Sequence, residues 1–366
     1  MKCKALVIVG TRPEAIKMAP VILALRNCPE INCCVLATAQ HRHMLDQVMK
    51  VFDIKPDIDL DVMRPNQTLT ALTARLLTGL DDVLLGEHPD VVLAQGDTTT
   101  VMTAALACFY HRIPFGHVEA GLRTWDLQNP FPEEMNRVVA GRLAKWYFAP
   151  TESSRQNLLR EGVSDTDIVV TGNTVIDALL SVVGRDVELP VELDPTKRLI
   201  LVTAHRRENF GEPFERICYA LLALLERNQN VQVLYPVHPN PNVRDTAHRL
   251  LGTHPRAVLC DPLDYLPFVE AMKRAYLILS DSGGVQEEAP ALGKPVLVLR
   301  HETERPEAVR EGVVKLVGTD YDMIVSEAQK LLDDKSAYAK MARGVSPYGD
   351  GHAAERIVKV LRNHFS

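Results

Sequence analysis

The sequence has no uninterrupted apolar run of about 18 residues, the length that a membrane-spanning helix needs, so we expect no membrane span. It has no basic excess either, because 41 Lys and Arg face 47 Asp and Glu and the net charge is −6. A nucleic-acid partner is therefore disfavoured, and any bound anion must be held by local basic residues. The short apolar stretch of MKCKALVIVG ends in Gly-Thr-Arg-Pro and predicts a first strand rather than a signal peptide.

The cysteines lack the spacing of a zinc site or a disulfide framework. There are seven, an odd number, and they are scattered without any CxxC pair. This usage favours reduced thiols in a cytoplasmic protein. His41 and His43 have the spacing H-x-H, but no further ligand stands in register, so we expect no metal.

The common glycine-rich phosphate motifs are absent as well. No G-K-[ST] follows Gly10, which excludes a Walker A loop, and Gly10 stands alone, which excludes GxGxxG. The second apolar run ends in Thr-Ala-Gln-His (38–41), without the acidic residue that usually binds the ribose of NAD. NAD is therefore disfavoured, and we expect no cofactor.

Short apolar runs alternating with amphipathic, helix-length stretches dominate the chain. This pattern predicts parallel sheets covered on both faces by helices. With 366 residues, the chain is long enough for two such doubly wound α/β domains, and the charged stretch 184–198 lies between the halves as the end of a linker. The expected strands are 5–9, 33–38, 90–95, 114–119, 145–150 and 167–172, then 198–204, 231–237, 257–261, 275–280, 294–300 and 313–318; helical patterns in the first half lie near 14–26, 68–87, 98–111 and 133–144.

The stretch GTRPEAIKMAP (10–20) carries two cations at the start of the first expected helix. Pro13 and Glu14 suit a helix N-terminus, but Arg12 and Lys17 do not, because that end already carries partial positive charge. A bound anion would explain both cations. The alternative is that they are solvated or paired with Glu14.

Nearly every expected strand ends in polar, ionisable residues, whereas the strand entrances are ordinary loops. Ligands of doubly wound sheets bind beyond the carboxyl ends of the strands, so this asymmetry predicts one cleft between two sheets. The residues at these ends are Arg12, Asp97, Glu119, Arg123, His205, Arg206, Arg207, Glu208, His238, the DSGG segment (281–284) and Arg305.

Each of these residues also has a purely structural interpretation. Asp97 is a good N-cap for the helix that follows it, as is Asp281 or Ser282 for the helix starting near Val285. Glu119 could form an ion pair with Arg123 instead of acting in catalysis.

Other candidates have similar alternatives. Glu133 and Glu134 suit the first turn of a helix, and His205 and His238 suit satisfied positions near a core. Together, however, the strand ends place basic groups and phosphate-type glycines in both halves and carboxylates mainly in the first. That distribution suits a diphosphate ligand whose reactive end lies near the carboxylates.

Several sequence blocks together resemble the non-hydrolysing UDP-N-acetylglucosamine 2-epimerases of bacteria, over almost the whole chain. The blocks are GTRPEAIKMAP, TAQHRHMLDQ, GDTTT, GHVEAGLRT, FPEEMNR, TGNTVIDAL, HRREN, YPVHPNPNVR, DSGGVQEEAPALGKPVLVLR, ERPEAV and SPYGDG. The resemblance implies a GT-B fold, with Rossmann-like domains at 1–180 (carrying the carboxylates) and 181–351 (binding UDP) around a central cleft. It also implies a C-terminal helix (352–366) that packs back on the first domain, and a homodimer.

The implied reaction interconverts UDP-GlcNAc and UDP-ManNAc by eliminating UDP, forming 2-acetamidoglucal, and adding UDP back. By matching motif, the catalytic residues would be Asp97, Glu119, Glu133 and His205; which carboxylate is the base at C2 and which the acid stays open. Substrate-binding residues would be Arg12 and Lys17 near the phosphates and sugar, Phe268 at the uracil, Ser282, Gly283 and Gly284 at the diphosphate, Glu288 at the ribose, and Arg305 and His238.

The chain departs from the family pattern at a few positions. Trp125 stands where glycine is common after GLRT, and a large ring there is expected to narrow or reshape the loop leading to Glu133. His301-Glu302 stands where Asp-Thr is usual. His43 and Asn66 replace residues that, in some members, help hold a second, regulatory UDP-GlcNAc, which puts activation by substrate in doubt.

Three other functions compete with this interpretation. A retaining glycosyltransferase of the same fold would need an acceptor but no C2 proton chemistry, so the full carboxylate set disfavours it. A hydrolysing epimerase would release free ManNAc and UDP. A UDP-sugar-binding sensor predicts loss of at least one candidate catalytic residue, and all four are present.

Overall fold

The computed structural model describes residues 2–38, 42–64 and 67–365, with the side chains of 42–44 left out. The expectations that rest on residues 39–41, on the side chain of His43 and on Asn66 lie outside the described residues. The chain divides into two compact units: Met1–Leu180 with Tyr348–Ser366, and Ser181–Pro347. From the sequence we predict the boundary between the two domains at 180/181 and the start of the C-terminal helix at 351/352.

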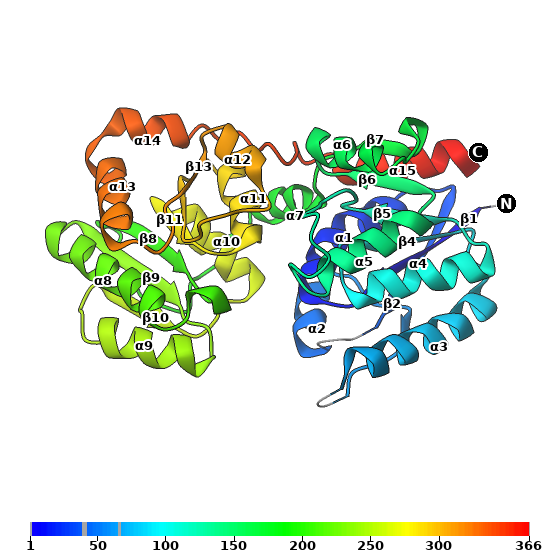
Figure 1. The fold of residues 1–366 in the computed structure, drawn as a ribbon, viewed down its shortest axis with the longest axis horizontal. Helices are drawn as coiled ribbons and strands as arrows, with labels where there is room; N and C mark the ends of the chain where they lie inside the picture. The colour runs from blue at the N-terminus through cyan, green and yellow to red at the C-terminus, as the bar shows by residue number, and fades with distance from the viewer. Residues whose placement is uncertain (1, 39–41, 65–66, 366) are drawn as a thin grey trace. The chain divides into compact units, whose positions relative to one another are not determined.

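The first unit is built on a parallel sheet in the order β3-β2-β1-β4-β5-β6-β7. Its strands are β1 (Cys3–Val9), β2 (Ile31–Ala37), β3 (Ile58–Asp59), β4 (Val91–Gln95), β5 (Phe115–Val118), β6 (Trp146–Ala149) and β7 (Ile168–Val170). Its helices are α1 (Arg12–Arg26), α2 (Arg42–Val51), α3 (Leu69–Glu87), α4 (Thr99–His111), α5 (Glu133–Leu143), α6 (Glu152–Arg160) and α15 (Ala353–Phe365), with a 3₁₀ turn at Asp165–Asp167 (Figure 1). Helix α7 (Thr174–Val182) begins in this unit and ends two residues beyond its boundary.

The second unit has a parallel sheet in the order β10-β9-β8-β11-β12-β13. Its strands are β8 (Arg198–Thr203), β9 (Val231–Pro236), β10 (Ala257–Cys260), β11 (Leu277–Ser280), β12 (Val296–Val298) and β13 (Val314–Leu316). Its helices are α8 (Glu212–Arg227), α9 (Pro241–Leu251), α10 (Tyr265–Arg274), α11 (Gly283–Ala291), α12 (Pro306–Arg310), α13 (Tyr321–Asp333) and α14 (Lys335–Met341), with a 3₁₀ turn at Arg207–Asn209.

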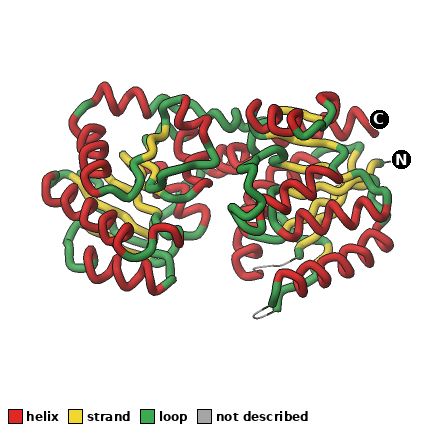
Figure 2. Tube along the Cα trace, viewed as in Figure 1, coloured by secondary structure: helices red, strands yellow, loops and turns green. Residues whose placement is uncertain are grey.

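In each unit the strands form a layer between helices (Figure 2), which explains why the strands are apolar along their whole length. In β1, for example, Leu6 and Val7 point to opposite faces of the sheet and both are fully buried. All strand pairs are parallel, and the register runs without interruption from Cys3 opposite Ile31 to Val9 opposite Ala37. The fold is therefore a two-domain, GT-B-like α/β fold, as the sequence predicts.

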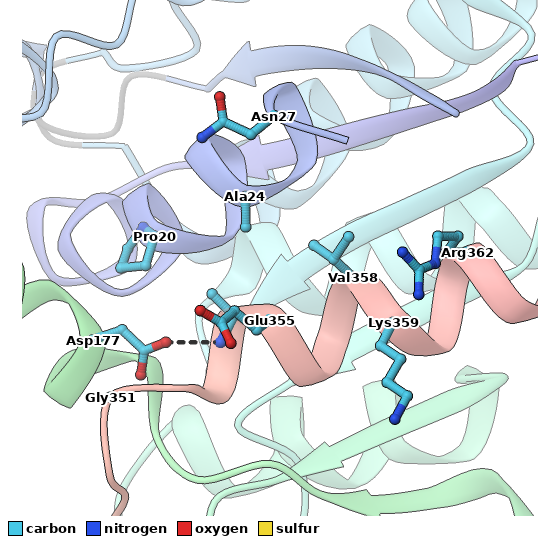
Figure 3. Close-up of a pocket in the computed structure, with 10 residues that line it drawn as sticks. Pro20, Ala24, Asn27, Asp177, Gly351, Glu355, Val358, Lys359 and Arg362 are labelled. Atoms are coloured by element: carbon cyan, nitrogen blue, oxygen red, sulfur yellow. Dashed lines mark hydrogen bonds between the residues drawn. The ribbon is translucent and has the colours of Figure 1, made fainter. Parts of the chain in front are cut away.

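The last helix, α15, packs on the first unit, where it contacts α1. Its buried residues recur at helical spacing, including Ala354, Val358 and Leu361. At its N-terminus, the backbone N–H of Ala354 donates to a carboxylate oxygen of Asp177 from α7 at 2.8 Å (Figure 3). At its other end the ring of His364 meets that of Trp146 edge-on, with centroids 4.9 Å apart.

No helix within the described ranges is both long enough and apolar enough to cross a bilayer.

Candidate active site

Each sheet has a point where the strand order reverses, and the candidate residues gather there. In the first unit the chain passes from β1 outward to β2 and β3, then returns to β4 on the other side of β1. In the second unit the same reversal occurs between β8 and β11. Loops beyond the carboxyl ends of strands at such a point form the usual ligand crevice of these sheets.

The turn after β1 is closed by Glu14, which is buried. Its Oε2 accepts the backbone N–H groups of Gly10 and Thr11, both at 2.7 Å, and Thr11 in turn caps α1. The other oxygen accepts the hydroxyl of Thr98 from the loop after β4. Burial raises the pKa of Glu14 to about 7, although these hydrogen bonds oppose the rise. Glu14 therefore ties the β1 and β4 loops together across the reversal point.

Lys17 points from α1 to Glu119, which follows β5. Its Nζ lies 2.5 Å from Oε1 of Glu119, and both side chains are almost fully buried. The same carboxylate accepts hydrogen bonds from the amides of Gln95 and Asn173. Glu119 also has a left-handed backbone conformation, with φ of 66°. A charged partner and two neutral donors thus fix this carboxylate in one orientation.

The interpretation that Arg123 is the partner of Glu119 is wrong. Arg123 forms a bidentate pair with Glu161, at 2.7 and 2.9 Å, and its side chain is buried. A bidentate arginine–carboxylate pair satisfies both groups at once, so Arg123 holds the loop after β5 against α6.

Asp97 follows β4 and is held from the start of α5. Nε and Nη2 of Arg137 lie 3.1 and 2.7 Å from Oδ2 of Asp97, and the amide of Asn136 donates to the Asp97 carbonyl at 2.8 Å. The N-cap interpretation of Asp97 is wrong, because the cap of α4 is Thr98. Asp97 is thereby left with its carboxylate facing a cation at the reversal point.

His117, on β5, supports the same loop. Its Nε2 lies 2.7 Å from the carbonyl of Gly96, which only accepts, so the ring proton is on Nε2. Complete burial lowers the pKa of His117 to about 4, so the ring is neutral. Sequence analysis did not identify Arg137, Asn136 and His117 as site residues. Their position inside the motifs FPEEMNR and GHVEAGLRT could have pointed to them.

The two acidic residues that begin α5 have different surroundings. Glu134 is buried; its Oε1 accepts the backbone N–H groups of Thr124 and Trp125, at 2.9 and 3.1 Å, and its Oε2 pairs with Arg137. Glu133 is half-exposed and makes no hydrogen bond or ion pair with other described residues. Glu134 therefore has the structural role, and Glu133 is available to a substrate.

Trp125 has a left-handed backbone conformation, with φ of 68°, which costs a non-glycine residue some stability. The residue is 56% exposed. The common glycine of the family thus suits the backbone at this position, and Glu134 compensates by binding the Trp125 N–H.

In the second unit, Asp281 joins the loops after β8 and β11. Its side chain is fully buried, and Oδ2 accepts the backbone N–H groups of His205 and Arg206, each at 2.8 Å, and the amide of Asn209 at 3.1 Å. The interpretation of Asp281 as the cap of α11 is wrong, since its carboxylate turns back to the β8 loop. The N-cap is Ser282, which makes no side-chain capping bond.

His205 and His238 are both exposed and stack on each other. Their rings are 10° from parallel, with centroids 5.5 Å apart. The interpretation of both as satisfied histidines near the core is therefore wrong. The pKa of His205 is lowered overall: partial burial of the ring lowers it most, His238 and Arg206 lower it further, and the Asp281 carboxylate opposes the fall.

The predicted diphosphate cradle lies at the start of α11. A Cβ on Gly283 would come 2.5 Å from Nη1 of Arg305, so only glycine lets this guanidinium approach the backbone. Arg305 is oriented by Glu287, whose Oε1 lies 2.6 Å from its Nε. One turn along the helix, the buried Glu288 accepts the hydroxyl of Tyr265 at 3.5 Å.

The remaining predicted residues fall at the same ends of the sheets. Arg12 begins α1 directly after β1, and Gly284 follows Gly283 in α11. Phe268 lies on α10 and is half-exposed. Within residues 2–38, 42–64 and 67–365, no group of three His, Cys, Asp or Glu side chains is suited to a metal ion.

A pocket of about 590 Å³ in the first unit lies elsewhere. It is lined by the C-terminal half of α1, by Asp177 and Gly351, and by residues of α15 that include Ala354 and Val358 (Figure 3). None of the predicted site residues lines it, and within α1 the predicted residues Arg12 and Lys17 lie in the N-terminal half instead.

The chain is similar to known proteins over almost its whole length. The family described as UDP-N-acetylglucosamine 2-epimerase matches residues 23–362. The chain is 57% identical over 371 residues to the UDP-N-acetylglucosamine 2-epimerase of Yersinia pestis, and 56% identical over 372 residues to that of Escherichia coli (strain K12), with 99% of each chain covered in both cases. The crystal structure of the Neisseria meningitidis UDP-GlcNAc 2-epimerase bound to UDP-GlcNAc superposes with a TM-score of 0.91 at 48% identity, covering 98% of this chain and all of that one. A match of this extent shows that the chain belongs to the UDP-N-acetylglucosamine 2-epimerase family.

Proposed function

We propose that the protein interconverts UDP-GlcNAc and UDP-ManNAc by inverting C2 of the sugar. The observation that carries the proposal is the first unit's reversal point, where Asp97 and Glu119 are each held by a buried or half-buried cation, Arg137 and Lys17. The binding of UDP-GlcNAc by the Neisseria meningitidis relative supports the choice of substrate.

The chemistry requires elimination, because no carbonyl stands next to C2 to make its proton acidic. The C1–O bond to UDP breaks, a base removes the C2 proton, and a C1=C2 double bond forms in 2-acetamidoglucal. UDP then adds back to C1 while an acid delivers a proton to the opposite face of C2. The sequence is redox-neutral, so it needs no redox cofactor.

The first unit supplies the groups that move protons. Asp97, Glu119 and Glu133 are the candidate acid and base, and each such group typically contributes about 10²–10⁴-fold. Lys17 and Arg12 are assigned to the phosphates and sugar, where positive charge stabilises the departing diphosphate.

The second unit is assigned the nucleotide. Gly283 and Gly284 present backbone N–H groups at the start of α11, a suitable cradle for a diphosphate, and Ser282 lies beside them with its own N–H donated to the Ser280 hydroxyl at 3.0 Å. Phe268 is assigned to the uracil and Glu288 to the ribose hydroxyls. Arg305, His238 and the catalytic His205 are assigned to the phosphate side.

Incubation with UDP-GlcNAc in D₂O, followed by proton NMR, tests the proposal. An epimerase yields UDP-ManNAc with deuterium at C2 and needs no acceptor. A glycosyltransferase gives no exchange, a hydrolysing epimerase releases free sugar, and a sensor leaves the substrate unchanged. Any of these three outcomes overturns the proposal.

We also propose a cytoplasmic homodimer. The C-terminal ends of α3 and α4 pack together and expose Leu85, Phe109 and Tyr110, which are 54%, 60% and 66% exposed. Exposed apolar side chains grouped in this way favour an interface between proteins. Light scattering of the wild type and of Phe109→Asp tests this, with a monomeric wild type contradicting it.

A further inference from the structure

Asp281 has a fully buried carboxylate whose two oxygens differ in their hydrogen bonding. Oδ2 accepts three hydrogen bonds, from the backbone of His205 and Arg206 and from Asn209. No hydrogen-bond donor among the described residues reaches Oδ1, although it too is buried. Buried polar atoms are nearly always paired, so an unpaired oxygen in a charged group calls for a functional explanation.

The neighbour of that oxygen is the imidazole of His205. Nδ1 lies 3.6 Å from Oδ1, which is too long for a hydrogen bond but within range of an ion pair. Three donors hold the carboxylate still, and two of them belong to the loop that carries His205. The backbone of His205 itself therefore holds the carboxylate beside the ring.

The other groups facing His205 repel its protonated form. His238 stacks on the ring, and its own Nδ1 accepts the backbone N–H of Asn240 at 3.1 Å. Arg206 is a neighbouring cation. Asp281 is the counter-charge that favours an imidazolium here, while 42% of the His205 side chain stays exposed to a ligand.

We propose that Asp281 is a positioning residue for His205: its carboxylate draws the Nδ1 proton toward Oδ1, stabilises the charged ring, and leaves the Nε2 proton to the departing diphosphate. The inference rests on the proposed function, in which His205 belongs to the active site.

Asp281→Asn is the direct test. The amide oxygen can accept the same three donors, but the amide nitrogen would face Nδ1 with a proton of its own. When neutral, His205 of this variant should then carry its ring proton on Nε2, and the ring should become protonated only at a lower pH than in the wild type. The ¹⁵N NMR spectrum of the ring reports both the tautomer and the titration. Turnover should fall about 10- to 100-fold, as when a partner that orients an imidazole is removed, and UDP affinity should change less than about twofold.

Two comparisons separate positioning from a purely structural role. In a His205→Asn background, Asp281→Asn should cause no further loss of turnover, because the carboxylate acts through the ring; additive losses would overturn the inference. Asp245→Asn, which removes an exposed carboxylate of α9, is the matched control and should change neither titration nor turnover.

The wild-type protein supplies a measurement that does not depend on the variant folding. Its neutral His205 should carry the proton on Nδ1, and finding it on Nε2 overturns the inference. This result is independent of activity, so a protein that failed to epimerise UDP-GlcNAc would refute the proposed function while leaving the pairing of Asp281 and His205 intact.

Discussion

Arg137 joins two carboxylates from different loops: its Nε and Nη2 hold Asp97 at 3.1 and 2.7 Å, while its Nη1 holds Glu134 at 3.0 Å. Arg137→Met would leave both carboxylates without their cation. We expect the free energy of unfolding to fall by about 3 kcal/mol and turnover to fall more than about tenfold, since Asp97 loses its orientation. Urea unfolding and epimerisation kinetics measure the two effects.

Arg142→Met on the same helix is the control for Arg137, because Arg142 makes an exposed contact with the carbonyl of Glu161. It should lower turnover less than about twofold. Equal losses in the two variants would mean that Arg137 does not act through Asp97.

Lys17→Met should reduce turnover on the order of 100-fold, because Glu119 would lose its ion pair with this lysine and the leaving diphosphate would lose a cation. Lys4→Met removes a lysine from the surface pair with Glu87, which is 2.7 Å long and about one-third exposed, and should change turnover little. The initial rate of UDP-ManNAc formation at saturating UDP-GlcNAc distinguishes the two. A fully active Lys17→Met enzyme would refute the assignment.

Glu133→Gln and Glu134→Gln should have opposite signatures although the residues are adjacent. Glu133→Gln should cut turnover by about 10²–10⁴-fold and leave the thermal midpoint unchanged, since its side chain makes no bond with the described residues. Glu134→Gln should destabilise the protein by about 2 kcal/mol, because two backbone N–H groups and Arg137 lose their anionic acceptor. Calorimetry together with kinetics checks both; a destabilised Glu133→Gln protein would contradict the division of roles.

Glu14 should make stability depend on pH. Its pKa is raised from 4.5 to about 7 in the folded protein, so folding favours the protonated form. The contribution of protonated Glu14 to the free energy of unfolding is complete below pH 4.5. It is lost as the pH rises through about 7, so the free energy of unfolding falls by an amount on the order of 3 kcal/mol. Glu14→Gln keeps the shape without the titration, so its unfolding free energy should lack this decline.

The matched control for Glu14 is Glu87→Gln, a change at a half-exposed surface acid. Urea unfolding of the three proteins from pH 4.5 to 8 gives the comparison. If the wild type and Glu14→Gln showed the same slope against pH, Glu14 would be ionised throughout the range.

The sequence predicts the strands well because both faces of each sheet are covered, so burial leaves long apolar runs such as ALVIV. The strand β3 is not predicted from the sequence, because Ile58–Asp59 is too short to show an apolar pattern. Candidate site residues can also be proposed from the sequence, because they follow directly on those runs.

Pairings between distant residues could not be predicted. Lys17 and Glu119 are 102 positions apart, and nothing local to either identifies the other as a partner. Similarly, Asp97 and Asp281 both precede helices and suit N-caps by residue type, but each carboxylate instead binds a loop or helix brought close only by the fold. Local rules name the residues at a strand end, and tertiary contacts then decide which role each one takes.

The position of α15 has a consequence for biosynthesis. Its residues leave the ribosome after those of the second unit, yet they cover α1 and meet Trp146 in the first unit. During translation, part of the apolar surface of the N-terminal half therefore stays uncovered while residues 181–347 are synthesised. Nascent chains arrested before residue 348 should accordingly be more readily cut by protease in the first unit than the released protein.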